Sequence, residues 1–312
     1  MNCELVVKNI QAQLKEYILG NSLKSLVLGV SGGIDSTLCA ALAWPVCEEL
    51  SIPLVGRSLP TITNGHDEIS RATEVGEAFC HNFKEMDISE EFEYLQKATA
   101  SSSGLDTGFQ KLTQNENNIR KGNLKARIRM CHLFDLAFTY KGMVLSTDNR
   151  TEYLLGFWTQ NGDVGNYGMI QNLDKSEVYE LTEFLHDFWL EKDSKKSEAL
   201  KHGVEADPTD GLGVSKTDLD QIMPDWKDRH LNCRSGYYEV DCILRSWLCD
   251  DIDSFVYDNN SLDFKERPKL WEEFEAYRKK LENNLVVIRH LRTEFKRHVP
   301  INLSRISVFG ER

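Results

Sequence analysis

The sequence predicts an α/β fold with a Rossmann-like, doubly wound and mostly parallel sheet, flanking helices and a helical C-terminal extension. Short apolar runs, typical of buried parallel strands, alternate with longer stretches whose apolar residues recur at helical spacing. From about residue 217 to 300 the signals become mostly helical. The sequence shows no internal repeat and no clear linker, so residues 1–312 are expected to form a single domain.

The composition narrows the class of protein. A hydrophobic content of 41% in 312 residues predicts a globular chain. The 37 Lys and Arg against 49 Asp and Glu give a net charge of −12, which argues against nucleic-acid binding because that binding depends on phosphate neutralisation. No apolar run approaches membrane-spanning length, so no membrane partner is expected. The eight cysteines form no CxxC pair and the N-terminus has no signal-peptide pattern, which favours reduced thiols and a cytoplasmic location.

The stretch at 26–42 organises the chain. It reads LVLGVSGGIDSTLCAAL, an apolar strand, a glycine turn and the start of a helix. Gly32 and Gly33 let the main chain approach an anion closely, and N–H groups at a helix N-terminus bind phosphate. Asp35 would repel a bare phosphate, so its presence indicates a bridging Mg²⁺. The absence of a lysine after the glycines excludes a Walker loop.

The elements up to residue 140 follow the same alternation. Helices are expected at 3–19, 65–81 and about 121–140, and strands at 52–56 and 82–88. Arg57 follows the second strand, at the sheet edge where ligands bind, although a solvated arginine is the alternative. The polar, poorly periodic stretch at about 98–120 is expected to be a mobile loop.

The helix expected at 121–140 carries several cations. Lys125 and Arg129 share a face, with Arg127 roughly opposite, so these cations cannot serve one purpose. Arginine suits bidentate recognition of phosphate or carboxylate, and a solvated basic face is the alternative.

A further strand is expected at 142–146, followed by Thr147 and by Glu152 in the first turn of the next helix. Asp35 and Glu152 would then project from two turns toward one sheet edge, where they could bind Mg²⁺ together with phosphate oxygens of a ligand. The glycine-rich stretch at 156–175 suits an irregular, ligand-lining loop that ends at Lys175 before another helix. The charged segment at 192–212 is expected to be a second mobile loop.

Together these motifs resemble the ammonia-dependent NAD⁺ synthetases of the PP-loop ATP pyrophosphatase superfamily, whose fold is adenine nucleotide alpha hydrolase-like. The matching motifs are SGGIDS at 31–36, Arg57-x-Leu-Pro, GNLKARIRM at 122–130, Thr147-Asp148 with Glu152, Gly-Phe-x-Thr at 156–159 with Gly162-Asp163, Lys175, LGVS at 212–215 and Lys296-Arg297 before a proline. They keep the family's order from about residue 25 to 300.

The resemblance implies a homodimeric ligase that converts deamido-NAD⁺, ATP and ammonia into NAD⁺, AMP and pyrophosphate, with Mg²⁺ as cofactor. It implies catalytic roles for Asp35 and Lys175, and Mg²⁺ ligation by Asp35 and Glu152. The positions that match ATP contacts are Gly29, Val30, Ser31, Gly32, Gly33, Ile34, Asp35, Ser36, Arg57, Thr147, Lys175 and Thr209. The positions that match deamido-NAD⁺ contacts are Arg127, Gln160, Tyr167, Phe295 and Lys296.

The sequence departs from the family pattern mainly in the deamido-NAD⁺ half. Gln160 replaces a lysine, Tyr167 or Asn166 falls where an aspartate is usual, and Asn149 and Phe295 replace histidines. Three alternatives therefore stay open: an amide ligase of the same superfamily with another carboxylate acceptor, a thiolating tRNA-modifying enzyme, and a nucleotide-binding regulatory module. The acidic composition and the absence of CxxC oppose the second, and the carboxylate pair with Lys175 opposes the third.

Overall fold

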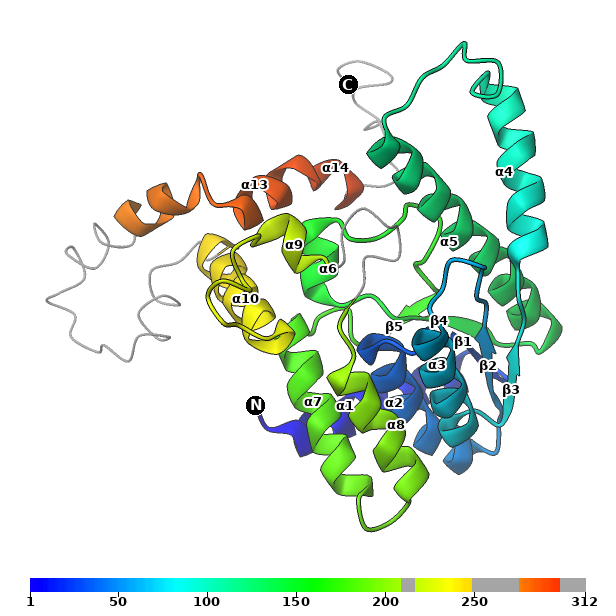
Figure 1. Cartoon of the computed structure of the whole chain (residues 1–312). Helices are drawn as coiled ribbons and strands as arrows, with labels where there is room; N and C mark the ends of the chain where they lie inside the picture. Colours follow the sequence, from blue (N-terminus) through cyan, green and yellow to red (C-terminus); the bar gives the residue numbers. More distant parts are fainter. Residues whose placement is uncertain (209–216, 249–274, 298–312) are drawn as a thin grey trace, which may run out of the picture.

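A computed structural model describes residues 1–208, 217–248 and 275–297. Its centre is a five-stranded sheet with the strand order β3-β2-β1-β4-β5, in which every strand pair is parallel (Figure 1). The strands are β1 (Leu26–Gly29), β2 (Leu54–Ser58), β3 (Asn82–Glu85), β4 (Met143–Ser146) and β5 (Tyr167–Gly168). The chain starts in the middle of the sheet and builds outward in both directions, so the predicted doubly wound fold is confirmed.

Helices cover both faces of the sheet. In the first part of the chain they are α1 (Cys3–Gly20), α2 (Ile34–Leu50), α3 (His66–Phe79), α4 (Ser89–Ser103), α5 (Gln114–Thr139), α6 (Arg150–Leu155), α7 (Lys175–Trp189) and α8 (Ser194–Glu205). The strand β1 shows why two layers form, because Leu26 and Leu28 belong to the large core with α2 and α7, whereas Val27 faces a smaller core under α5. This alternation follows from the two-residue period of a strand.

Two segments that were expected to be loops contain helices. Within 98–120, α4 continues to Ser103 and α5 begins at Gln114, where Thr113 forms a capping box with Glu116. Within 192–212, α8 occupies Ser194–Glu205 and buries Leu200 against its neighbours. The loop predictions are wrong for these helical parts, because a helix cap and a few buried apolar residues outweigh a polar composition, whereas residues 104–113 form no helix.

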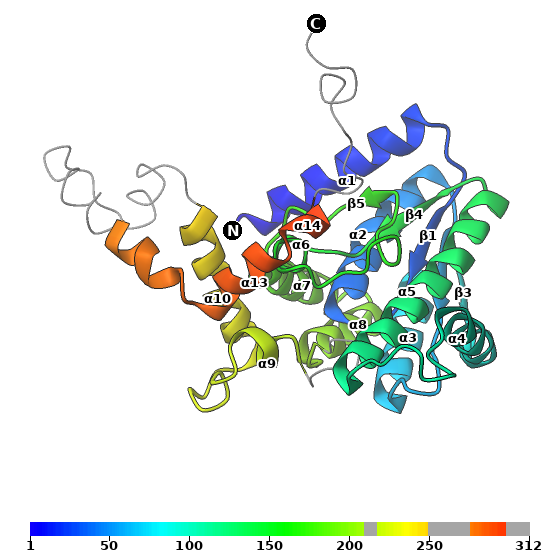
Figure 2. The ribbon, with the colours of Figure 1, turned by 90° about the horizontal axis from the view of Figure 1, so that it is seen from above.

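The C-terminal part is helical, as predicted, over the described residues. It contains α9 (Leu219–Ile222), α10 (Cys233–Leu248), α13 (Leu285–Arg292) and α14 (Glu294–Arg297). Figure 2 shows α13 and α14 beside α6, which places them near the carboxyl edge of the sheet. Among the described residues, no helix has the length and apolar character needed to cross a membrane.

Candidate active site

The turn between β1 and α2 leads directly into the N-terminus of α2. Gly32 has a φ of +77°, and a Cβ there would lie 2.6 Å from the backbone oxygen of Glu68, so only glycine fits. The hydroxyls of Ser31 and Ser36 lie 3.1 Å apart, and Ser31 Oγ accepts a hydrogen bond from Gly33 N at 3.2 Å. No side chain caps α2 at Gly33, so the first N–H groups of this helix are available to an anion.

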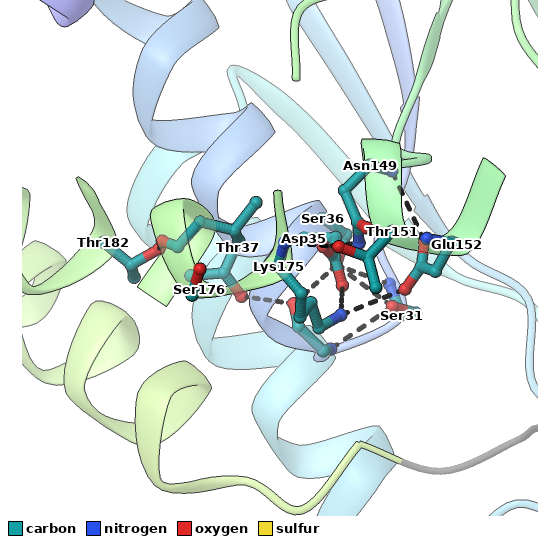
Figure 3. A network of polar contacts seen from close by, with 12 residues as sticks. Ser31, Asp35, Ser36, Thr37, Asn149, Thr151, Glu152, Lys175, Ser176 and Thr182 are labelled. Carbon is teal, nitrogen blue, oxygen red and sulfur yellow. Dashed lines mark hydrogen bonds and ion pairs between the residues drawn. The ribbon is translucent and has the colours of Figure 1, made fainter. Parts of the chain in front are cut away.

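A buried lysine joins two carboxylates beside this loop. Lys175 Nζ lies 2.5 Å from Asp35 Oδ2 and 3.0 Å from Glu152 Oε1, and its side chain is only 2% exposed (Figure 3). Burial alone would lower the pKa of Lys175, but the two carboxylates outweigh it and raise that pKa well above its usual value. Burial and the charge of Asp35 raise the pKa of Glu152. The predicted convergence of Asp35 and Glu152 is therefore present, and the structure adds the ammonium of Lys175 between the two carboxylates.

A second set of hydrogen bonds fixes the main chain at Lys175. Lys175 N donates to Thr151 Oγ1 at 2.9 Å, and that hydroxyl donates to Asp241 Oδ1. Asp241 Oδ2 also accepts a hydrogen bond from Ser176 N at 2.8 Å. Burial raises the pKa of Asp241 to about 6. Sequence reasoning missed Asp241 because it lies on α10, far along the chain, where no local motif marks it.

Two neighbouring cavities both border the loop at 31–36. One has a volume of about 260 Å³ and lies between the loop, α3 and α5. The other has a volume of about 740 Å³ and lies between α5, the segment after α6 and the C-terminal helices α13 and α14. Both are lined by Ser31, Thr147, Thr159 and Asp163. A molecule in the first cavity and a molecule in the second would therefore meet at these side chains.

The smaller cavity contains part of the predicted ATP set. Gly29, Val30 and Arg57 line it together with Arg129. Arg57 is buried, and its Nη1 donates to the backbone oxygens of Gly56 and Asn82, so this guanidinium group is largely committed to the sheet. The side chains of Arg129 and Arg127 point to different cavities, as predicted from their positions on the helix.

The larger cavity brings together four of the five residues predicted to contact deamido-NAD⁺. They are Arg127, Gln160, Phe295 and Lys296. Arg127 Nη2 donates to the backbone oxygen of Gln160 at 3.2 Å. Lys296 Nζ donates to the backbone oxygen of Gly156 at 2.6 Å, and burial lowers the pKa of Lys296.

The structure does not bring Tyr167 into either cavity of this chain. Tyr167 lies on β5, pairs with Leu145 and packs its ring against Tyr17 of α1 at 4.9 Å. Asn166 does not take its place, because its side chain accepts a hydrogen bond from Val144 N at 3.0 Å. Within the described part of this chain Tyr167 packs against α1 and Asn166 binds β4, so the deamido-NAD⁺ contact expected at this position stays a prediction. Thr209 and the LGVS string lie outside the described residues.

Several cavity residues were given no role by sequence reasoning, although most of them stand in the matched motifs. Asp163 accepts two hydrogen bonds from Thr159 N at 2.8 Å, and burial raises the pKa of Asp163 to about 7. Thr159 Oγ1 donates to Asn123 Oδ1 at 2.7 Å, which ties the loop after α6 to α5. Arg289 of α13 packs over the ring of Phe157 at 3.8 Å. Only the short Thr159–Asp163 spacing gave a local signal that could have revealed one of these contacts.

The donor chemistry fits a magnesium ion. The described residues contain no group of three or more His, Cys, Asp and Glu side chains that could hold a metal ion by themselves. Two carboxylates that converge on one ammonium provide part of an oxygen shell, and phosphate oxygens would complete it. Asp35 and Glu152 are therefore suited to an ion that arrives with a nucleotide.

The family profile described as NAD synthase matches residues 6–234. The chain belongs to the NAD synthase family. This match covers the loop, the carboxylate pair and Lys175 and confirms the resemblance predicted from the motifs.

Relatives in this family support the assignment over most of their length. The NH₃-dependent NAD⁺ synthetase of Methanococcoides burtonii is 32% identical over 207 residues, which are 65% of this chain and 72% of that protein. Two solved structures share the fold. The match with the NMN synthetase of Francisella tularensis has a TM-score of 0.67 at 23% identity and covers 97% of this chain and 99% of that chain. The NH₃-dependent NAD synthetase of Campylobacter jejuni has a TM-score of 0.59 at 21% identity and covers 97% and 100%.

Proposed function

We propose that this NAD synthase family member is an ammonia-dependent ligase that makes NAD⁺ from deamido-NAD⁺, ATP and ammonia, in the last step of NAD⁺ biosynthesis. The observation that carries the proposal is the position of the phosphate loop. It lies where two cavities meet, with Asp35, Glu152 and Lys175 beside it. A ligase that joins a nucleotide to an acceptor carboxylate needs this arrangement, because both substrates must reach one phosphorus atom.

The smaller cavity is assigned to the adenosine half of ATP, and the loop at 31–36 to its phosphates. Free N–H groups at the start of α2 and the hydroxyls of Ser31 and Ser36 would hold the departing phosphates. Asp35 and Glu152 would hold Mg²⁺, which neutralises phosphate charge and so favours the departure of pyrophosphate. Lys175, whose ammonium lies beside the same two carboxylates, would add a positive charge for the ATP phosphates when Mg²⁺ binds.

The larger cavity is assigned to deamido-NAD⁺. Its wall combines the cations Arg127, Arg292 and Lys296 with the aromatic ring of Trp158, groups that suit a phosphate-bearing molecule with flat rings. The nicotinate carboxylate would then enter beside Thr147, one of the residues that line both cavities.

The reaction has two steps. A carboxylate oxygen of the nicotinate ring attacks the α-phosphorus of ATP, and the bond between that phosphorus and the bridging oxygen breaks as pyrophosphate leaves. Ammonia then attacks the acyl carbon, the bond from carbon to the adenylate oxygen breaks, and AMP leaves while the nitrogen loses a proton. The chain contributes chiefly by positioning both substrates and by neutralising charge.

The test is pyrophosphate release by the purified chain with ATP, Mg²⁺ and ammonium, with NAD⁺ measured in parallel. We expect release to depend on deamido-NAD⁺ and to match NAD⁺ formation one for one. The nicotinate mononucleotide is the comparison acceptor, because one structural neighbour is described as an NMN synthetase. Release with the mononucleotide and not the dinucleotide would replace the acceptor but keep the chemistry. ATP binding without release under any condition would contradict a ligase.

The proposal includes a homodimer in the cytoplasm. On α5, Phe134 and Phe138 are four residues apart and 42% and 88% exposed, so they form an apolar face that a second copy could cover. The described cysteines are all free, which suits a reducing compartment. Light scattering after size exclusion tests the dimer, and a monomer mass at micromolar concentration would exclude it.

A further inference from the structure

Asn149 makes hydrogen bonds to both of the residues that carry the two carboxylates. It precedes α6, and its side chain is completely buried. Its Nδ2 donates to Asp35 Oδ1 at 2.8 Å, and its Oδ1 accepts from Glu152 N at 3.0 Å (Figure 3). Glu152 Oε2 in turn accepts from Asn149 N at 3.4 Å. One amide therefore joins the start of α2 to the start of α6.

These contacts determine which oxygens face the cation. The side-chain Nδ2 of Asn149 occupies Asp35 Oδ1 and its main-chain N–H occupies Glu152 Oε2, so Asp35 Oδ2 and Glu152 Oε1 are left facing the same point. That point is occupied by Lys175 Nζ, which is bound by these two oxygens and by no other carboxylate among the described residues. Without the Nδ2 donor, the Asp35 carboxylate could turn about its terminal bond and lose this alignment.

The two tasks of Asn149 require opposite hydrogen-bonding groups. The contact with Glu152 N needs an acceptor, and the contact with Asp35 needs a donor. Serine and threonine keep the acceptor, since they are good helix N-caps, but their shorter side chains cannot also donate to Asp35. Aspartate keeps the acceptor but places a negative charge against Asp35.

We propose that Asn149 is a positioning residue that orients Asp35 and Glu152 to receive Mg²⁺ together with ATP. It acts through these carboxylates and touches no substrate. The proposal rests on the proposed function only for the identity of the ion and nucleotide. It also explains how the site keeps its geometry although the resemblance leads one to expect a histidine at this position.

The test separates metal binding from folding and from turnover. The variants Asn149→Ser and Asn149→Thr keep the helix cap and remove the donor to Asp35. Asn2→Ser is the matched control, because Asn2 is also an N-cap, on α1, and its side chain accepts from Leu5 N at 3.1 Å. Mn²⁺, used in place of Mg²⁺, is titrated by electron paramagnetic resonance in the presence of ATP and without acceptor.

We expect both Asn149 variants to bind Mn²⁺ about 10- to 100-fold more weakly, as is usual when a residue that holds a metal ligand is lost. ATP affinity without metal should stay unchanged, and Asn2→Ser should match the wild type. In turnover, the Mg²⁺ concentration for half-maximal rate should rise more than kcat falls. Wild-type Mn²⁺ affinity in both folded variants, or an equal loss of metal-free ATP affinity, would overturn the proposal. Because the titration uses no acceptor, a wrong acceptor assignment leaves this test intact.

Discussion

The ammonium of Lys175 lies where a divalent ion would have to bind, which leads to an unusual expectation for Lys175→Met. The wild-type ammonium must leave Asp35 and Glu152 before Mg²⁺ can bind to them, and ATP phosphates give it a new partner. Mg²⁺ and ATP should therefore bind with positive coupling in the wild type. Methionine keeps the unbranched apolar stem but lacks the charged end, so in the variant no ammonium should compete with Mg²⁺ and the coupling between Mg²⁺ and ATP should be lost.

The magnitude follows from the two ion pairs. Lys175 is 2% exposed, and the Asp35 and Glu152 side chains are 17% and 19% exposed, so solvent screens these pairs little. Removing one partner of a buried ion pair costs about 3–5 kcal/mol. We expect the metal-free variant to lose stability by up to about this amount, with proton uptake by Glu152 reducing the loss. Turnover should fall by about 100- to 1,000-fold, the usual effect of removing one group that stabilises transition-state charge.

The assay is a calorimetric titration of Mg²⁺ without ATP, followed by the same titration with ATP. We expect Lys175→Met to bind Mg²⁺ without ATP at least about tenfold more tightly than the wild type, which corresponds to about 1.4 kcal/mol. Lys196→Met is the matched control, since Lys196 is also buried and lies 2.6 Å from Asp193, away from both cavities. If Lys175→Met binds Mg²⁺ no better than the wild type, the ammonium does not compete with the metal and this reasoning is refuted.

Three further results are expected. Arg127→Ala should raise KM for deamido-NAD⁺ by about tenfold or more, the value of one charged hydrogen bond, and leave KM for ATP within about twofold; a change in the ATP constant alone would reassign the larger cavity. Asp241→Ala should lower the free energy of unfolding by about 1–3 kcal/mol and should also lower kcat, because it leaves buried donors unpaired. Asp241→Asn should lose less of each. Chemical denaturation and initial rates measure the two effects, and equal losses in the two variants would contradict the role of these hydrogen bonds. The melting temperature of the ligand-free protein should rise as the pH falls from about 8 to about 6. Burial raises the pKa values of Asp148 and Asp163 to about 6 and about 7, and it raises the pKa of Glu152. The folded state therefore binds more protons than the unfolded state over this range. The lowered pKa of His290 acts in the opposite direction, and a melting temperature that falls over this range would contradict the assignment of the raised values.

The parts of the fold that were predicted correctly depend on short-range patterns. The strand β1, its glycine turn and α2 form one continuous stretch, so apolar periodicity and two glycines were sufficient to place Asp35 at a helix start. Glu152 was placed in the same way, by a strand that ends six residues before it. Because parallel strands end at one sheet edge, the convergence of these two carboxylates followed from the fold class.

The parts that were missed depend on contacts between distant segments. Asp241 comes to Lys175 only because α10 packs on α7. The sequence places Tyr167 in a ligand-lining loop, but pairing of β5 with β4 turns it toward α1. Residues 194–205 are polar enough for a loop, yet α7 and α2 provide a surface against which the helix buries Leu200. In each case tertiary packing, which one sequence does not display, determines the outcome.

The proposed reaction requires the acceptor carboxylate to attack the α-phosphorus of ATP at the junction of the two cavities. Deamido-NAD⁺ labelled with ¹⁸O in both carboxylate oxygens tests it directly, with AMP and pyrophosphate examined by mass spectrometry after one turnover. Attack on the α-phosphorus predicts one ¹⁸O in AMP, none in pyrophosphate, and one in the amide of NAD⁺. Label in pyrophosphate or inorganic phosphate, or AMP without label, would show that the carboxylate does not attack the α-phosphorus.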